Sequence, residues 1–293
     1  MDAPNPSALP TFASRAPLHI GTVSLTVRDL GAVAAYYRHL LGLTEVGRTA
    51  DTVRLGTDRV AFLELTHRPA ASPDEEREAG LYHTAFLMPT RTDLARFVRH
   101  IGQSQVPVTG ASDHGVSEAI YLDDPEGNGV EVYVDRPAES WEWRDGLVSM
   151  ITERLDIPGL MRADNGIPYV EAPAGLRVGH IHLRVGDVEA AERFWRDVVG
   201  LDVTRGGRHG ATFLSSGRYH HHVANNIWHS RGAGPRDPDR AGLHWFEIEA
   251  NDPAALDTIA ERLRNAGAPV TGRDRGFETA DPWGTRVRFV PAA

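Results

Sequence analysis

The sequence predicts an α+β protein assembled from repeated strand and helix units, and two observations lead to this class. First, IGTVSLTVRDLGAVAAYYRHLLGL at 20–43 aligns without gaps with VGHIHLRVGDVEAAERFWRDVVGL at 178–201, a constant offset of 158 positions. Second, DPEGNGVEVYV at 124–134 recurs as DPWGTRVRFVP at 281–291. The chain is therefore an internal duplication, and each half holds two related units.

Each unit is expected to consist of one strand, one helix and three further short strands. In the first unit an alternating strand leads to Asp29, which suits a helix N-cap, and Gly42 ends that helix. The third unit repeats this arrangement with Asp187 and Gly200. The four units span 18–67, 80–136, 178–229 and 241–291.

The segments outside the units divide the chain. Residues 1–17 are rich in Pro, Ala and Ser, which predicts a mobile N-terminal arm. Residues 137–177 carry several Pro and Gly and are expected to form a long ordered linker. This leaves a first domain at 18–136 and a second at 178–293, each with two units.

Composition narrows the classes of function. The chain has 31 Lys and Arg against 40 Asp and Glu, a net charge of -9, and lacks the dense basic stripe that phosphate neutralisation needs. We therefore expect no nucleic-acid partner. No segment approaches the roughly 20 apolar residues of a membrane span and the amino terminus shows no signal pattern, so we expect a cytoplasmic protein without a membrane partner.

The cysteine and histidine counts point to one kind of metal chemistry. The chain has no cysteine and 14 histidines. A thiol nucleophile, an iron–sulfur cluster and a thiolate zinc site are therefore excluded. Any metal would be bound by imidazole and carboxylate groups.

Four strand–helix–three-strand units resemble the vicinal oxygen chelate superfamily, which includes glyoxalases, bleomycin resistance proteins and extradiol dioxygenases. The resemblance covers 18–291, nearly everything but the arm and the linker. It implies four βαβββ modules paired into two half-open barrels, with a metal inside a barrel. The periodicity does not decide whether consecutive units pair or whether the second pairs with the third.

In that superfamily the metal ligands come from the first strand of each paired unit and from a last strand. The equivalent first-strand positions here are Thr22, His83, His180 and His244. Pairing the first unit with the second leaves Thr22 in a ligand position, and pairing the third with the fourth places Arg288 where a carboxylate is needed. Pairing the second with the third gives His83, His180 and Glu131, the two imidazoles and one carboxylate that suit Fe(II), and Mn(II) as well.

The segment SDHGVSEAIYLDDPEGNGVE at 112–131 resembles the extradiol ring-cleaving dioxygenase signature. The matching features are His114, an aliphatic residue before Tyr121, the Asp-Pro-x-Gly turn and the liganding Glu131, whereas Ser112 departs from it slightly. The fourth unit keeps the turn but lacks the His, Tyr and Glu. The resemblance implies that Tyr121 hydrogen-bonds the substrate or an iron-bound oxygen and that His114 orients the substrate or a ligand.

A run of three histidines begins the last strand of the third unit. The family's His-x-aliphatic-Ala pattern aligns with 221–224, which makes His221 the acid–base residue beside the oxygen site. Alternation would turn His220 and His222 to the other side of the sheet, and a register error of one residue would exchange them. His182 shares the face of His180 and is a further pocket candidate.

The resemblance implies a non-haem Fe(II)-dependent extradiol dioxygenase, similar to the catechol-2,3-dioxygenase branch. Its partners would be a small aromatic diol and O₂, and its product a muconic semialdehyde. Three alternatives stay open: a hydroquinone-cleaving enzyme with the same site, a glyoxalase-like metal isomerase or transferase, and a metal-free protein that binds a small molecule. Sheet edges in this fold are compatible with a homo-oligomer.

Overall fold

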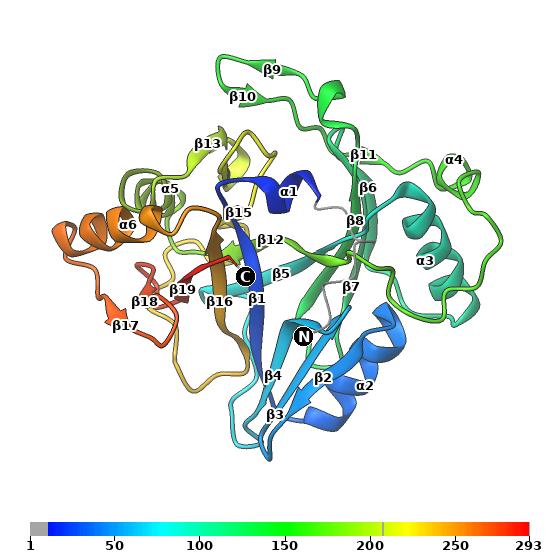
Figure 1. Cartoon of the computed structure of the whole chain (residues 1–293), viewed down its shortest axis with the longest axis horizontal. Coiled ribbons are helices and arrows are strands. Elements are labelled where there is room, and N and C mark those ends of the chain that lie inside the picture. Colours follow the sequence, from blue (N-terminus) through cyan, green and yellow to red (C-terminus); the bar gives the residue numbers. More distant parts are fainter. Residues whose placement is uncertain (1–10, 207, 293) are drawn as a thin grey trace.

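The computed structural model describes residues 11–206 and 208–292 and contains the four expected units in order (Figure 1). The first consists of β1 (Leu18–Val27), α2 (Leu30–Leu41), β2 (Thr44–Arg48), β3 (Thr52–Thr57) and β4 (Val60–His67). The second consists of β5 (Gly80–Leu87), α3 (Arg91–Gln103), β6 (Gly110–Asp113), β7 (Ser117–Asp123) and β8 (Gly129–Asp135). The third consists of β12 (Arg177–Arg184), α5 (Val188–Arg193), the π-helical η2 (Phe194–Val199), β13 (Asp202–Arg205), the short η3 (Arg208–Gly210), β14 (Ala211–Ser215) and β15 (Val223–Asn226). The fourth consists of β16 (Gly242–Ala250), α6 (Ala254–Asn265), β17 (Thr271–Gly272), β18 (Phe277–Ala280) and β19 (Arg286–Pro291).

The units pair across the two halves of the chain. The nine-stranded sheet has the order β11-β6-β7-β8-β5-β12-β15-β14-β13, so the second and third units meet at the antiparallel pair β5 and β12. The eight-stranded sheet has the order β17-β18-β19-β16-β1-β4-β3-β2, so the fourth and first units meet at β16 and β1. Both sheets curl into half-open barrels, which confirms the predicted α+β fold. The domains 18–136 and 178–293 stay a prediction, since each sheet draws one unit from each half.

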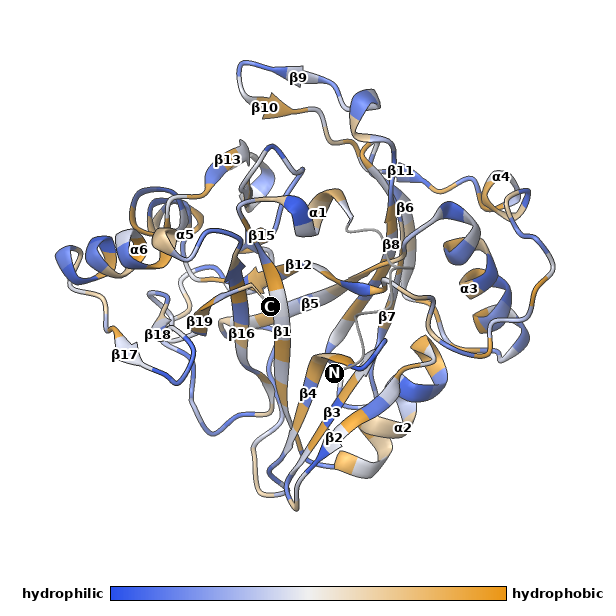
Figure 2. Cartoon of the chain, viewed as in Figure 1, coloured by the Kyte–Doolittle hydropathy of each residue, from blue (hydrophilic) through white to orange (hydrophobic). Residues whose placement is uncertain are grey.

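One hydrophobic core joins the two sheets. Strand β1 contributes Val23 and Leu25, and β12 contributes Ile181 and Leu183, all fully buried in the same cluster. Figure 2 shows hydrophobic residues concentrated along the central strands, while α3 and α6 carry hydrophilic residues on their outer turns. The half-barrels are therefore held together by apolar burial. Among the described residues no helix combines the length and apolarity required to cross a membrane.

The predicted helix ends are present. The Asp29 side chain accepts a hydrogen bond from the Ala32 amide at 2.9 Å, and Gly42 ends the helix in the left-handed conformation with a φ of 66°. A Cβ atom on Gly42 would lie 2.5 Å from the backbone nitrogen of Ala172. Glycine is thus required at this position both for the turn and for the approach of the linker.

The linker folds back onto the nine-stranded sheet. Its elements are η1 (Ala138–Ser140), β9 (Trp143–Arg144), β10 (Leu147–Val148), β11 (Glu153–Arg154) and α4 (Ile157–Met161). Strand β11 pairs with β6 at the sheet edge. Trp141 is buried, and its ring contacts Tyr219 at a centroid distance of 5.8 Å.

The predicted mobile arm, 1–17, stays a prediction, and its described part makes contacts with the rest of the protein. Residues Phe12–Arg15 form α1, which packs on the linker through Phe12 and Trp141, with ring centroids 5.5 Å apart. His222 donates a hydrogen bond from Nε2 to the Ala13 carbonyl oxygen at 3.1 Å. These contacts join the N-terminal segment to the linker and to the third unit. Residues 1–10 lie outside the described part.

Candidate metal centre

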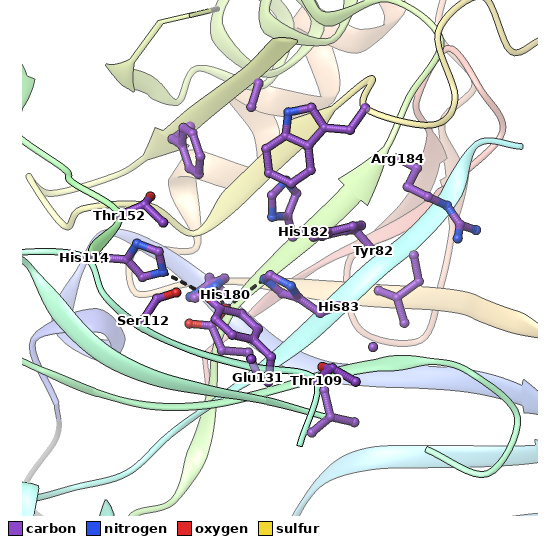
Figure 3. Close-up of a pocket in the computed structure, with 18 of the residues that line it drawn as sticks. Tyr82, His83, Thr109, Ser112, His114, Glu131, Thr152, His180, His182 and Arg184 are labelled. Carbon is purple, nitrogen blue, oxygen red and sulfur yellow. Dashed lines mark hydrogen bonds and ion pairs between the residues drawn. The ribbon is translucent and has the colours of Figure 1, made fainter. Parts of the chain in front are cut away.

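A cavity of about 700 Å³ opens on the nine-stranded sheet, lined by strands of the second and third units and by part of the linker. All six site residues named from the sequence line it: His83, His114, Tyr121, Glu131, His180 and His221. Figure 3 shows His83, Glu131 and His180 close together, with His114 and Thr152 to their left in the view. A cavity of this size is typical of a small-molecule site.

The strand register explains why His83, Glu131 and His180 converge. Strands β8, β5 and β12 are neighbours, and Ala85 on β5 is opposite Glu131 on one side and His180 on the other. His83 precedes Ala85 by two residues and therefore projects from the same face. The small side chain of Ala85 leaves space between its two neighbours.

Three potential ligand atoms meet in this space. Glu131 Oε2 lies 2.9 Å from His83 Nε2 and 3.2 Å from His180 Nε2. All three side chains are buried, and their ligand atoms lie within 4.8 Å of one another. Among the described residues this is the one cluster of His and carboxylate groups able to hold a metal ion.

The protonation states of Glu131 and His180 favour the binding of a cation. Burial alone would raise the pKa of the Glu131 carboxyl, but the imidazoles of His180 and His83 outweigh burial and hold this pKa well below its usual range. Burial lowers the pKa of His180 to about 4. At neutral pH the cluster therefore combines a carboxylate with a neutral His180 imidazole, whose Nε2–H donates to Glu131 Oε2 and whose proton a bound cation would replace.

A buried nitrogen without a hydrogen bond supports the same conclusion. His83 Nε2 is only 2.9 Å from the Glu131 carboxylate, yet among the described residues it has no hydrogen-bond partner. A nitrogen lone pair facing a carboxylate oxygen is unfavourable unless a proton or a metal ion lies between them. Two imidazoles and one carboxylate fit Fe(II) or Mn(II) and leave coordination positions open.

His114 and Tyr121 form a hydrogen-bonded pair beside the cluster. The Ile151 carbonyl oxygen can only accept, so His114 donates to it from Nδ1 at 2.9 Å. Nε2 of the neutral ring then accepts the Tyr121 hydroxyl proton at 2.7 Å. Tyr121 lies directly opposite Glu131 in the strand register, and burial raises the pKa of its hydroxyl well above the usual value.

His221 is the histidine of the 220–222 run that faces the cavity. Its ring centroid lies 4.0 Å from that of His180, and burial together with His180 and His220 lowers its pKa well below the usual value. His220 instead contacts Asp135 Oδ1 at 2.8 Å, and His222 contacts the N-terminal segment.

Sequence reasoning missed part of the cavity wall. Among the missed residues is Tyr82, whose ring centroid lies 5.2 Å from that of the cavity residue Trp228 and 4.8 Å from that of His182. The linker adds Met150 and Thr152. Alternation from His83 predicts that Tyr82 faces away, and no motif signals that the linker returns to the site.

The equivalent positions of the other sheet hold positive charge instead of a ligand set. Arg288, at the position of Glu131, pairs with Glu278 at 2.9 Å and lies 3.6 Å from the centre of the Trp245 ring. Burial, reinforced by three arginines, lowers the pKa of His244 to about 4. This half-barrel therefore supports the fold, and its described residues include no comparable cluster of metal ligands.

Comparison with known proteins identifies the class. The Glyoxalase/Bleomycin resistance protein/Dioxygenase superfamily matches residues 19–132 and 177–289, which cover most of all four units. The chain therefore belongs to this superfamily. The crystal structure of glyoxalase I from Zea mays shares the fold, with a TM-score of 0.56 at 14% identity over 96% of this chain and 94% of that one.

Curated relatives narrow the class further. The catechol-2,3-dioxygenase of Bacillus subtilis (strain 168) is 36% identical over 278 residues, covering 93% of this chain and 97% of the relative. Biphenyl-2,3-diol 1,2-dioxygenase 3 of Rhodococcus globerulus is 30% identical over 128 residues, covering 42% of this chain and 67% of the relative. Within the superfamily the chain is thus an enzyme of the extradiol dioxygenase type.

Proposed function

We propose that the protein is a non-haem Fe(II)-dependent extradiol dioxygenase that cleaves a catechol-type aromatic diol with O₂ to a muconic semialdehyde. The observation that carries this proposal is the convergence of His83, His180 and Glu131 in a cavity that also contains Tyr121 and His221. The names of the relatives support a diol substrate.

The three proposed ligands define what the chain contributes to metal binding. His83, His180 and Glu131 would hold the ion and leave it able to bind the two diol oxygens and O₂. When bound, Fe(II) supplies a path for electron density between the chelated diol and O₂. Mn(II) suits the same ligands.

The residues around the ligands would exchange protons with the substrate hydroxyls and form hydrogen bonds to them. His221 is neutral at the cavity wall and is placed to accept a proton from a diol hydroxyl and to return it later. Tyr121 keeps its own proton, which it donates to His114, so its oxygen presents lone pairs to a substrate hydroxyl. Both side chains act on protons beside the bound diol.

Reconstitution with a defined metal tests the proposal. The metal-free protein is loaded with Fe(II) or Mn(II) without oxygen, and oxygen uptake and ring-fission absorbance are followed with catechol, substituted catechols and hydroquinone. We expect metal-dependent uptake of one O₂ per ring cleaved. Cleavage of hydroquinone alone would favour the sister activity, and diol binding without metal or turnover would favour a binding protein.

Variants at equivalent positions of the two sheets test the ligands. His83→Ala and Glu131→Gln should each lower metal content and activity by at least about 10-fold, because each removes one of three ligands. His244→Ala removes the equivalent of His83 in the other sheet, and this variant should keep normal metal content and normal activity. Normal metal content in the His83 and Glu131 variants would refute this ligand set.

A further inference from the structure

A chain of buried and partly buried hydrogen bonds begins at His221 Nδ1. His221 Nδ1 lies 2.8 Å from His220 Nδ1, and His220 Nε2 lies 2.8 Å from Asp135 Oδ1. The Tyr219 hydroxyl donates to the same Asp135 oxygen at 3.1 Å. Tyr133 contacts the Tyr219 hydroxyl at 2.7 Å and completes the chain.

The chemistry of these groups sets the direction of each hydrogen bond. A carboxylate only accepts, so His220 donates to Asp135 from Nε2–H. A neutral imidazole carries one N–H, which leaves His220 Nδ1 as an acceptor. The short contact between the two Nδ1 atoms then requires His221 to supply its proton from Nδ1.

The protonation state of the other ring nitrogen of His221, Nε2, follows from this assignment. Its Nε2 carries a lone pair and has no hydrogen-bond partner among the described residues, while the side chain lines the cavity. We propose that Asp135 and His220 are positioning residues that hold His221 in the Nδ1–H tautomer, so that a lone pair on Nε2 faces the substrate. This inference depends on the proposed function only for its effect on catalysis.

Strand β8 connects this series of hydrogen bonds with the candidate metal cluster. Glu131, Tyr133 and Asp135 alternate along β8 and project from one face of the strand. Tyr133 is fully buried, and a Cβ atom on Gly179 would lie 1.9 Å from its hydroxyl oxygen. The same strand therefore positions the proposed carboxylate ligand and the carboxylate that orients His220.

The neighbouring His222 shows that burial alone does not produce this arrangement. His222 accepts from the Ser216 amide at Nδ1 and donates to the Ala13 carbonyl oxygen, so its ring is held by backbone groups alone. It does not line the cavity. His222 therefore provides a matched control: a buried histidine, one residue from His221, without a carboxylate partner.

The tautomers can be read directly in the full-length, metal-free protein. Long-range proton–nitrogen correlation spectra of protein labelled with ¹⁵N-histidine distinguish Nδ1–H from Nε2–H rings. We expect Nδ1–H for His221 and Nε2–H for His220. His220→Phe and Asp135→Ala should leave His221 as a mixture of tautomers, whereas Asp135→Asn, which keeps an acceptor oxygen, should largely retain Nδ1–H.

Kinetics of the Fe(II)-loaded enzyme test the consequence. His220→Phe and Asp135→Ala should lower kcat about 100-fold, because the proton-accepting nitrogen is no longer presented consistently, with KM and iron content within about twofold. His222→Phe should leave the His221 tautomer unchanged and kcat within about threefold.

Three results would overturn the inference: an Nε2–H tautomer for His221 in the wild type, an unchanged tautomer in both variants, or a mixed tautomer with normal kcat. Should His220→Phe fail to fold, Asp135→Ala tests the same link from the other end. Absence of ring cleavage by the wild type would count against the proposed function, and the tautomer spectra would still decide this inference.

Discussion

Tyr121 shows how one side chain depends on three separate parts of the chain. It lies opposite Glu131 on the neighbouring strand, and its hydroxyl is held by His114. His114 is held in turn by the carbonyl oxygen of Ile151 in the linker. The orientation of the Tyr121 oxygen in the cavity is therefore determined by contacts far apart in the sequence.

Replacing Tyr121 by Phe removes this oxygen but keeps the ring. We expect kcat to fall about 10- to 100-fold, because a substrate hydroxyl loses its hydrogen-bond partner, while metal content stays at the wild-type level. Steady-state kinetics with metal analysis of the same sample measure both. Tyr36→Phe, which removes a buried hydroxyl outside the cavity, serves as the control. Loss of metal in Tyr121→Phe would mean that Tyr121 supports the ligands instead.

At the scale of elements, the aspartates of the two Asp-Pro-x-Gly turns differ in the hydrogen bonds that their side-chain oxygens accept. Both oxygens of Asp124 are hydrogen-bonded, and Asn128 donates to them from its backbone and its side chain. Asp281 Oδ1 accepts from the Trp283 and Thr285 amides, but Oδ2 is buried without a partner among the described residues. Burial therefore raises the pKa of Asp281 to about 6.

This raised pKa predicts a loss of stability as pH increases. The folded state favours the neutral carboxyl, so the contribution is fully present below the unfolded pKa near 4 and is lost as pH rises through about 6. Asp281→Asn keeps the accepting oxygen and removes the charge. Between pH 4 and 7 the wild type should lose about 2 kcal/mol relative to the variant.

Urea unfolding of both proteins in the same buffers measures this difference, and contributions from other groups cancel in the comparison. Parallel stability curves over this pH range would show that the pKa of Asp281 is the same in the folded and unfolded states.

For the whole molecule, the decisive feature is that neither half contains all three candidate metal ligands. His83 and Glu131 come from the second unit, and His180 comes from the third, across the junction of β5 and β12. The other sheet joins the first and fourth units in the same manner. Both halves therefore contribute to both sheets and to the one cluster.

Cutting the linker tests this interdependence. Val170 is 79% exposed and precedes the segment that contacts Gly42, so a protease site inserted after it is accessible. The cut chain should stay assembled and bind about one metal ion, because two sheets and a shared core hold the halves together. Each half expressed alone should bind little metal, and mixing the halves should restore it. Size-exclusion chromatography with metal analysis distinguishes these outcomes, and full metal binding by one half would contradict the shared site.

Much of the fold could be predicted because the signals are local. The cap at Asp29, the left-handed Gly42 and the strand alternation depend on residues within a few positions of each other. Because the units are repeats of one another, the same local patterns recur in each unit. His83 and His180 were found in this way, as equivalent residues of two first strands.

Residue types, unit boundaries and the candidate ligands were thus determined by the sequence alone. The pairing of the second unit with the third, the orientation of His221 and the return of the linker to the cavity were decided only by the tertiary structure. The physical reason is that periodicity specifies which face of a strand is apolar but not which edge it pairs with. That choice depends on the burial of surfaces from distant segments, and here it brings His83, Glu131 and His180 to one point.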